Sequence, residues 1–251
     1  MLWQTMNQTV ELGWDFYLPV LIFVGLIALA VPVWAAIGTA AITMLVMSGD
    51  LPLSLVGEKL FTGIDAFALT AVPLFILTGD VLVRTGLSRK FLDVAEALTQ
   101  FAKGGFGSAT VLVCGMFAAI SGSDAAGAAA VGRMTIARLV ESGYPRPYAC
   151  ALVAAGACTG ILIPPSIAYI IIGLVLGISA STLFLAALIP GLAILISILV
   201  TNVIVNRIHG YEGGGNISMG EYFSRLAASL KSGWYAFIVP GIIFYGIFSG
   251  R

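Results

Sequence analysis

Charged residues are scarce in this 251-residue chain: lysine and arginine total 12, aspartate and glutamate total 12, and there is one histidine. The formal net charge is zero, and the sequence lacks the basic cluster that nucleic-acid-binding proteins carry. Hydrophobic residues make up 59% of the chain, and the mean hydropathy is +1.04. This composition excludes an ordinary soluble domain and predicts an all-α polytopic protein in the lipid bilayer.

Cysteine is also rare, with three residues in apolar surroundings: Cys114, Cys150 and Cys158. An odd number without regular spacing argues against a disulfide framework and against a cysteine metal site. We therefore interpret these cysteines as small hydrophobic residues.

Basic residues flank the apolar runs, and such residues gather on the cytoplasmic side of a membrane protein. Residues 50–65 carry only one of them, so we place that segment outside. We predict an outward crossing through about 17–48 and a return through about 67–83. Pro32 leaves two interpretations of the first run, one long span or a broken element. The flanking residues are Arg84, Arg89, Lys90, Lys103, Arg133, Arg138, Arg146 and Arg207.

The segment from Ser88 to Lys103 has the pattern of an amphipathic helix. Its apolar residues recur at helical spacing and its charged residues fall on the other face, which predicts a helix at the membrane surface. The apolar residues are Phe91, Leu92, Ala95 and Leu98, and the charged ones are Arg89, Lys90, Asp93 and Glu96.

The apolar stretch between Lys103 and Arg133 contains one charge, Asp124, within a Ser-Gly-Ser-Asp-Ala-Ala-Gly run. Basic residues at both ends place those ends on the same side, but two full crossings need about 40 residues. We therefore predict a re-entrant hairpin over 104–139 whose helix breaks at 121–127. An ionisable residue at this depth indicates a functional site.

A second break is predicted between Arg146 and Arg207, where the sequence accommodates spans over 147–178 and 182–206. Pro164 and Pro165 remove two backbone donors from the first of these spans. Unwound carbonyls can coordinate a cation, and the amino ends of half-helices attract an anion, so two breaks together indicate an ion-coupled carrier. Close packing of small residues and a simple proline kink form the alternative interpretation.

Several motifs in order resemble one family over nearly the whole chain. They are Ala71-Val72-Pro73-Leu74-Phe75-Ile76-Leu77-Thr78-Gly79, then Phe117-Ala118-Ala119-Ile120-Ser121-Gly122-Ser123-Asp124-Ala125-Ala126, Gly143-Tyr144, Gly160-Ile161-Leu162-Ile163-Pro164-Pro165-Ser166-Ile167, and Phe184 to Pro190-Gly191. This pattern resembles the large membrane (permease) subunit of TRAP transporters, the DctM-like family.

The resemblance implies an elevator-type transporter, not an enzyme, in the bacterial inner membrane. It implies sodium-coupled uptake of an organic anion of the carboxylate class, which a periplasmic binding protein delivers and a small four-helix membrane subunit assists. By motif position, the resemblance implies that Ser121, Asp124 and the backbone carbonyls of Gly160, Ile163 and Pro164 bind sodium. Ser123 and Ser166 lie beside the breaks, and we predict that they contact the substrate.

The resemblance also implies different roles for three segments of the chain. Residues 1–103 are expected to form scaffold spans and the surface helix, and 104–209 half of the transport domain. Residues 210–251 are expected to form a polar loop, an amphipathic helix and the start of further scaffold. The family resembles an inverted repeat, so we expect this chain to be the amino-terminal half: a fragment, a truncation or one part of a split permease.

Asp124 replaces the hydroxyl residue that the family often has. A carboxylate is a hard ligand that suits sodium, but it can also carry a proton, and it can cap the second arm of the hairpin. Two other functions stay open. One is an inactive or scaffold membrane subunit, and the other is an intramembrane aspartyl protease that uses Asp80 and Asp124 as its dyad.

Overall fold

The computed structural model describes residues 14–49, 52, 54–213 and 218–249, and every regular element in these residues is a helix. The chain divides into two compact units, residues 1–66 and 67–251. Within the described residues, three helical stretches are long and apolar enough to cross a membrane. They are Arg146–Leu176, Ala180–His209 and Met219–Ile247. These helices confirm the prediction of an all-helical polytopic membrane protein.

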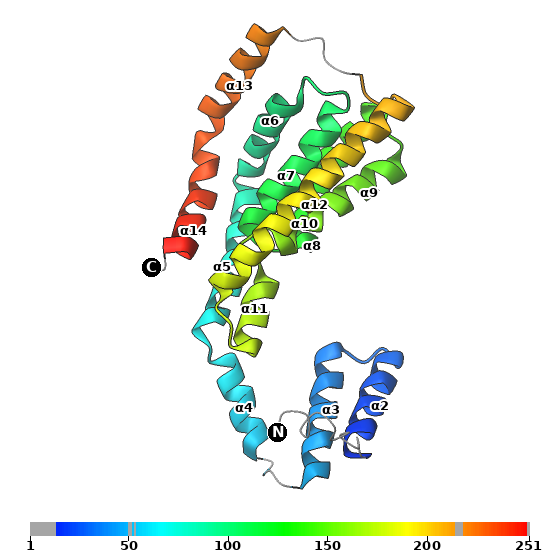
Figure 1. Ribbon diagram of the computed structural model, residues 1–251, viewed down its shortest axis with the longest axis vertical. Helices are drawn as coiled ribbons and strands as arrows, with labels where there is room; N and C mark the ends of the chain where they lie inside the picture. Colours follow the sequence, from blue (N-terminus) through cyan, green and yellow to red (C-terminus); the bar gives the residue numbers. More distant parts are fainter. Residues whose placement is uncertain (1–13, 50–51, 53, 214–217, 250–251) are drawn as a thin grey trace, which may run out of the picture. The chain divides into compact units, whose positions relative to one another are not determined.

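The first unit contains two helices that pack side by side, α2 (Trp14–Ala28) and α3 (Val33–Ser48), followed by α4 (Ser54–Ile64) (Figure 1). The predicted single crossing through 17–48 is therefore wrong. Ala30 adopts a φ of 58°, and Pro32, which has no N–H, precedes the first turn of α3. The chain reverses at this point, so the broken element is the correct interpretation.

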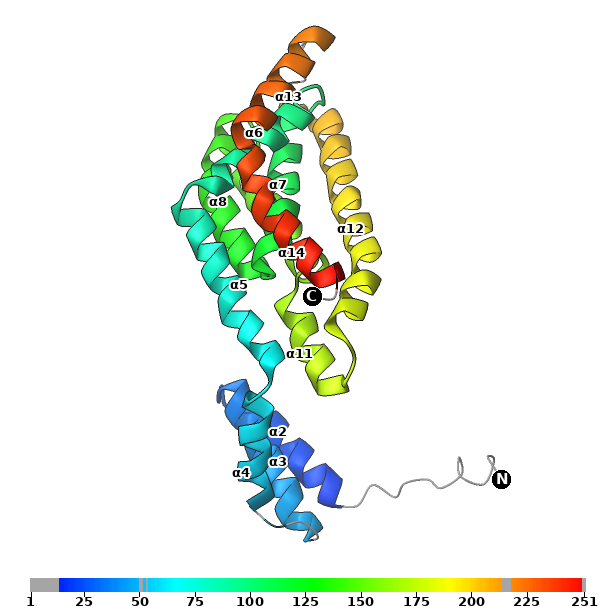
Figure 2. The same ribbon diagram turned by 90° about the vertical axis from the view of Figure 1, so that its left-hand side faces the viewer.

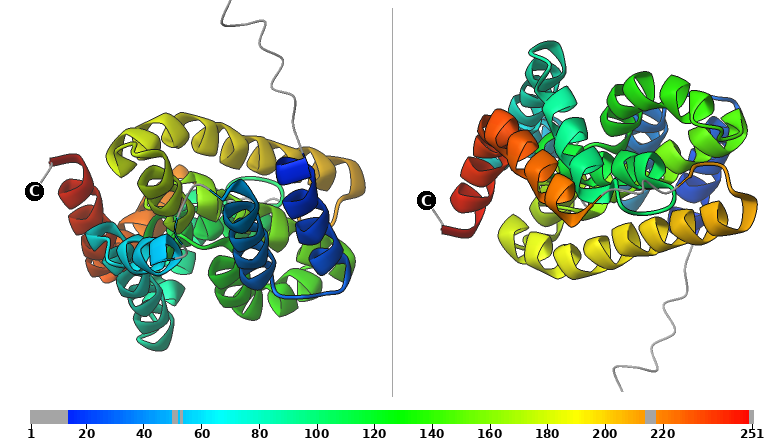
Figure 3. Two further views of the ribbon diagram at one scale, coloured as in Figure 1. Left: turned by 90° about the horizontal axis from the view of Figure 1, so that it is seen from below. Right: turned by 90° about the horizontal axis from the view of Figure 1, so that it is seen from above.

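In the second unit α7 lies at the centre and packs against α6, α8, α9 and α12 (Figures 1 and 2). Seen along the bundle, α12 and the α13–α14 stretch flank it on different sides (Figure 3). The helices are α5 (Phe67–Arg84), α6 (Leu87–Thr99), α7 (Gly105–Ser121), α8 (Asp124–Glu141), α9 (Arg146–Ala157), α10 (Thr159–Leu162), α11 (Ile167–Leu176), α12 (Ala180–His209), α13 (Met219–Gly233), the 3-10 helix η1 (Trp234–Phe237) and α14 (Ile238–Ser249).

The amphipathic pattern of α6 is confirmed, and its apolar face packs on protein. Phe91, Leu92 and Ala95 are buried, and the helix contacts α7 and α13. Leu98, predicted on the apolar face, is exposed instead. The helix also ends at Thr99, before the predicted Lys103; the Thr99 hydroxyl donates to the Gly105 carbonyl at 2.7 Å. A location at the membrane surface stays a prediction.

A carboxylate from the loop after α12, 106 residues beyond Phe106 in the sequence, caps the amino terminus of α7. The Glu212 side chain accepts hydrogen bonds from the backbone N–H of Phe106 at 2.8 Å and of Gly107 at 3.4 Å. It also accepts one from the Tyr144 hydroxyl at 3.0 Å. The first N–H groups of a helix have no partner within it and carry a partial positive charge, so a carboxylate stabilises them. Glu212 thereby joins the loop after α12 to the base of α7.

Two neighbours of Glu212 fix its position. The Asn206 amide donates to the Glu212 carbonyl at 2.6 Å and accepts from the Glu212 N–H at 2.8 Å. Burial and the nearby Glu212 carboxylate raise the pKa of Tyr144, so its hydroxyl stays protonated and donates. These contacts form a polar latch, which we define as Glu212, Asn206 and Tyr144.

We predict that Glu212→Ala lowers the free energy of unfolding by about 1–3 kcal/mol, because two helix N–H groups and a buried phenol lose their acceptor. Thermal or denaturant unfolding of the detergent-solubilised chain, followed by circular dichroism, measures the change. Glu221→Ala is the matched control, because Glu221 forms an exposed ion pair with Arg225, and such pairs contribute at most about 1 kcal/mol. Equal losses in the two variants would contradict the latch.

Candidate functional site

The break between α7 and α8 consists of two residues, Gly122 and Ser123. Gly122 has a φ of +59°, which glycine adopts without strain. The Ser123 hydroxyl accepts a hydrogen bond from the Ala126 N–H at 3.4 Å and caps α8. The predicted break over 121–127 is thus too long, because this cap starts the helix at Asp124. Ser123 occupies the cap position, so the idea that Asp124 caps the second arm is wrong.

The second predicted break is confirmed. Helix α10 ends at Leu162, residues 163–166 are not helical, and α11 begins at Ile167. Neither Pro164 nor Pro165 has an N–H, so the carbonyls four residues earlier, those of Gly160 and Ile161, receive no helical hydrogen bond from them. The proline pair therefore ends α10 and leaves carbonyl oxygens free of helical partners.

The two breaks contact each other through their backbones. The Ile167 N–H donates to the Gly122 carbonyl at 3.3 Å. A Cβ on Gly122 would lie 2.7 Å from the Pro165 carbonyl oxygen, and a Cβ on Gly160 would lie 2.8 Å from the Asp124 nitrogen. Real Cβ atoms do not approach backbone atoms this closely, so the contact requires glycine at both positions. We call this contact the break junction.

Of the predicted site residues, five lie at the break junction: Ser121, Ser123, Asp124, Gly160 and Ser166. Ser121 is buried, and its hydroxyl donates to the Ser123 carbonyl at 3.3 Å. Asp124 is half-buried, and its carboxylate has no hydrogen bond or ion pair within the part of the chain that the structure describes. Ser166 is fully buried, and its hydroxyl has no partner among those residues. A buried hydroxyl normally has a partner, so this one is available to a ligand.

Four helix ends also meet at the break junction. Helices α8 and α11 begin there at Asp124 and Ile167, whereas α7 and α10 end there at Ser121 and Leu162. Helix amino ends carry partial positive charge and carboxyl ends carry partial negative charge. The junction therefore offers N–H groups to an anion and carbonyl oxygens to a cation within one small region.

A cavity of about 400 Å³ adjoins the junction and is lined by Ser121, Ser123, Asp80 and Arg133, among others. Helix α5 closes one side of it, where a Cβ on Gly79 would lie 3.3 Å from the Ser121 Cβ. Sequence reasoning gave Gly79 no role, although it ends a motif that carried the family resemblance. Arg133, one of the basic residues that flank the apolar runs, also lines this cavity.

Asp80 is paired with Arg84, and no hydrogen bond between Asp80 and Asp124 is present within the described residues. Its carboxylate forms an ion pair with Arg84 at 2.6 Å, and the Asp80 side chain is 53% exposed. The described residues also contain no group of three or more His, Cys, Asp or Glu side chains that could hold a metal ion. These contacts give no support to an aspartyl protease dyad.

These features define a multi-pass helical membrane protein in which two interrupted helices meet at their breaks. A family model described as "Tripartite ATP-independent periplasmic transporter, DctM component" matches residues 20–251, so the chain belongs to the DctM family. The resemblance found in the sequence is thereby confirmed. The family and the apolar helices make the chain a multi-pass protein of the bacterial inner membrane.

Curated relatives carry TRAP permease names. The isethionate TRAP transporter permease protein of Oleidesulfovibrio alaskensis is 34% identical over 93% of this chain and 36% of the relative. The C4-dicarboxylate large permease protein of Pseudomonas aeruginosa is 36% identical over 84% of this chain and 48% of the relative. The sialic acid large permease protein of Vibrio cholerae is 31% identical over 91% of this chain and 53% of the relative. The chain thus spans about a third to a half of the length of these relatives.

We predict that Gly160→Ala destabilises the chain by about 1–3 kcal/mol, because the added methyl group forces the α8 amino terminus away from α10. Denaturant unfolding in detergent measures the change. Gly241→Ala is the control, because a Cβ at Gly241 would meet nothing within 4 Å, and alanine favours a helix. A Gly160→Ala variant as stable as the control would show that the junction is looser than described.

Proposed function

We propose that this chain is part of the large permease subunit of a TRAP-type secondary transporter, in which uptake of an organic anion is coupled to sodium. The observation that carries this proposal is the break junction. It unites free carbonyl oxygens, a free carboxylate and the amino ends of two helices at one place in an apolar bundle. Ion-coupled carriers bind their coupling ions and substrates at such interrupted helices.

For sodium, the proposed ligands are the Ser121 hydroxyl, the Asp124 carboxylate and the backbone carbonyls of Gly160, Ile163 and Pro164. All are hard oxygen donors, which suit a hard cation. Support comes from the close approach of Gly160 to Asp124 and from the absence of an ion-pair partner for Asp124 in the described residues. Asp124 can also carry a proton, so proton coupling is the alternative that the experiment below distinguishes.

For the substrate, we propose an organic acid whose anionic group lies near Ser123 and Ser166. The amino ends of α8 and α11 attract negative charge, and Arg133 adds a positive charge on the adjoining cavity. The relatives are named for isethionate, C4-dicarboxylates and sialic acid, and each of these molecules carries an acidic group. Which of these acids is transported depends on the complete permease.

Transport itself is proposed for the complete assembly. This would include the remainder of the large subunit, a small four-helix membrane subunit and a periplasmic binding protein that delivers the anion. The same proposal includes three further features. They are the elevator movement, the re-entrant path of α7 and α8, and the functional division of the chain after residues 103 and 209. A non-catalytic role agrees with the transporter names of the relatives.

We predict that sodium raises the thermal unfolding temperature of the purified chain, because a ligand that binds only the native state stabilises it by RT ln(1 + [Na⁺]/Kd). At a sodium concentration of about 100 Kd the gain is about 2.7 kcal/mol. Ser121→Ala and Asp124→Ala should both remove the effect. Potassium replaces sodium as the ion control at equal ionic strength.

Asp80→Asn is the matched carboxylate control, since Asp80 lines the adjoining cavity but is paired with Arg84. It should keep the full sodium effect. Stabilisation by low pH without any response to sodium would favour proton coupling. A well-folded chain with no response to either ion would favour an inactive or scaffold subunit.

A further inference from the structure

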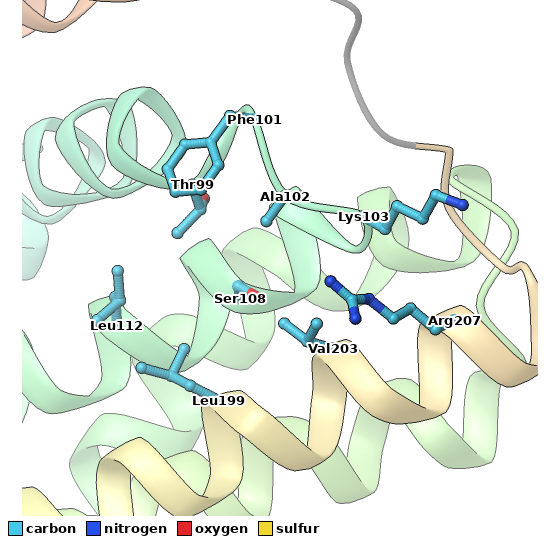
Figure 4. Close-up of a pocket in the computed structure, with 9 residues that line it drawn as sticks. All are labelled: Thr99, Phe101, Ala102, Lys103, Ser108, Leu112, Leu199, Val203 and Arg207. Atoms are coloured by element: carbon cyan, nitrogen blue, oxygen red, sulfur yellow. The ribbon is translucent and has the colours of Figure 1, made fainter.

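A second cavity, of about 820 Å³, lies at the base of α7, away from the break junction. It is bounded by the turn between α6 and α7, by the first two turns of α7 and by the last turns of α12 (Figure 4). Its lining residues are Thr99, Phe101, Ala102, Lys103, Ser108, Leu112, Leu199, Val203 and Arg207. None of the functional residues considered above lines it.

The charge on this cavity is entirely positive. Lys103 and Arg207 lie at the same end of it; the Arg207 guanidinium points toward the cavity, and the Lys103 ammonium points outward (Figure 4). Both residues are exposed, and neither has an ion pair within the described residues. No acidic residue is among the nine that line the cavity. Two cations that have no ion-pair partner favour an anion at this end, and the nearby Glu212 carboxylate is bound by the α7 amino terminus and Tyr144.

The opposite end of the cavity is apolar. Leu199, Val203 and Arg207 are spaced four residues apart and therefore form one stripe along α12, from apolar to basic. Leu112 faces the apolar end from α7 (Figure 4). The rise between Leu199 and Arg207 is about 12 Å, because eight residues each contribute about 1.5 Å. The cavity thus has a basic mouth and an apolar floor.

We propose that this cavity binds an anionic phospholipid of the cytoplasmic leaflet. Its phosphate binds the Arg207 guanidinium and the Lys103 ammonium, whose exposed side chain turns inward, and the upper part of an acyl chain runs over Val203, Leu199 and Leu112. Both basic residues belong to the ends that the charge distribution assigns to the cytoplasm, where headgroups lie. Basic pockets between transmembrane helices on that side bind anionic headgroups.

A lipid here would connect α7 and α12 beside the polar latch. The Asn202 amide already links the two helices there, because it donates to the Ser108 hydroxyl at 3.1 Å and to the Gly104 carbonyl at 3.3 Å. Ser108 also lines the cavity. The lipid therefore adds a second connection at the base of α7, independent of any ion at the break junction.

Native mass spectrometry of the full 251-residue chain, released from detergent with added phosphatidylglycerol, tests this inference. We expect one tightly bound phosphatidylglycerol, and the double variant Lys103→Gln/Arg207→Gln should weaken its binding about tenfold or more, since each basic residue near a headgroup contributes appreciably. The control Arg89→Gln/Lys231→Gln removes two exposed cations that have no ion pair within the described residues and do not line the cavity, and it should bind as the parent chain does. Val203→Phe, which narrows the apolar floor without changing charge, should also weaken binding.

Binding measurements with phosphatidylcholine and with glycerol 3-phosphate distinguish a whole anionic lipid from a soluble phosphate as the ligand. Weaker binding of both supports a site for a whole anionic lipid. Binding of glycerol 3-phosphate as tight as that of phosphatidylglycerol would overturn the inference in favour of a soluble phosphate. Equal losses in the cavity and control double variants, each with unchanged far-ultraviolet circular dichroism, would overturn it in favour of general surface attraction.

Discussion

The close packing of Gly122 on Pro165 and of Gly160 on Asp124 is the constraint on which the proposed site depends. A helix that stops in an apolar bundle leaves backbone groups unpaired, which is tolerated only where protein or water covers them. Here two interrupted helices cover each other. Because glycine has no Cβ, the backbones of the two helices can come into contact at these positions. This is why Ser121, Asp124 and Ser166 come together although they lie on different helices or helix ends.

The central helix α7 is held at both of its ends, by different physical means. At its base, Glu212 accepts the helix N–H groups, and the Asn206 amide holds Glu212 in turn. At its tip, the contact is steric and involves few polar bonds. Polar contacts fix the position of the base, whereas the tip keeps a carboxylate and a hydroxyl free of partners within the described residues. Polar attachment at the base and free ligand groups at the tip suit the proposed ion site, which would have to bind and release its ion.

Sequence reasoning located both helix breaks because proline and glycine report directly on backbone geometry. The pair Pro164-Pro165 removes two successive backbone donors, which ends the helix here, and the Ser-Gly-Ser run lacks strong helix formers. Reasoning from hydropathy failed for residues 17–48, because a run of apolar residues does not say whether Pro32 bends a span or reverses it. The cap at Ser123 was missed because Asp124 is an equally good capping residue. Gly79 and Glu212 act through partners 42 and 106 residues away, and no local pattern encodes such contacts.

The central claim is that both helix breaks form one cation site. Hydrogen–deuterium exchange of the purified chain, with and without sodium, tests it most directly, because exchange reports local opening of each segment separately. The account predicts that sodium slows amide exchange in residues 119–128 and 159–168 together and leaves α13 unchanged. Protection of one segment alone, or of neither in a folded chain, would contradict a shared site.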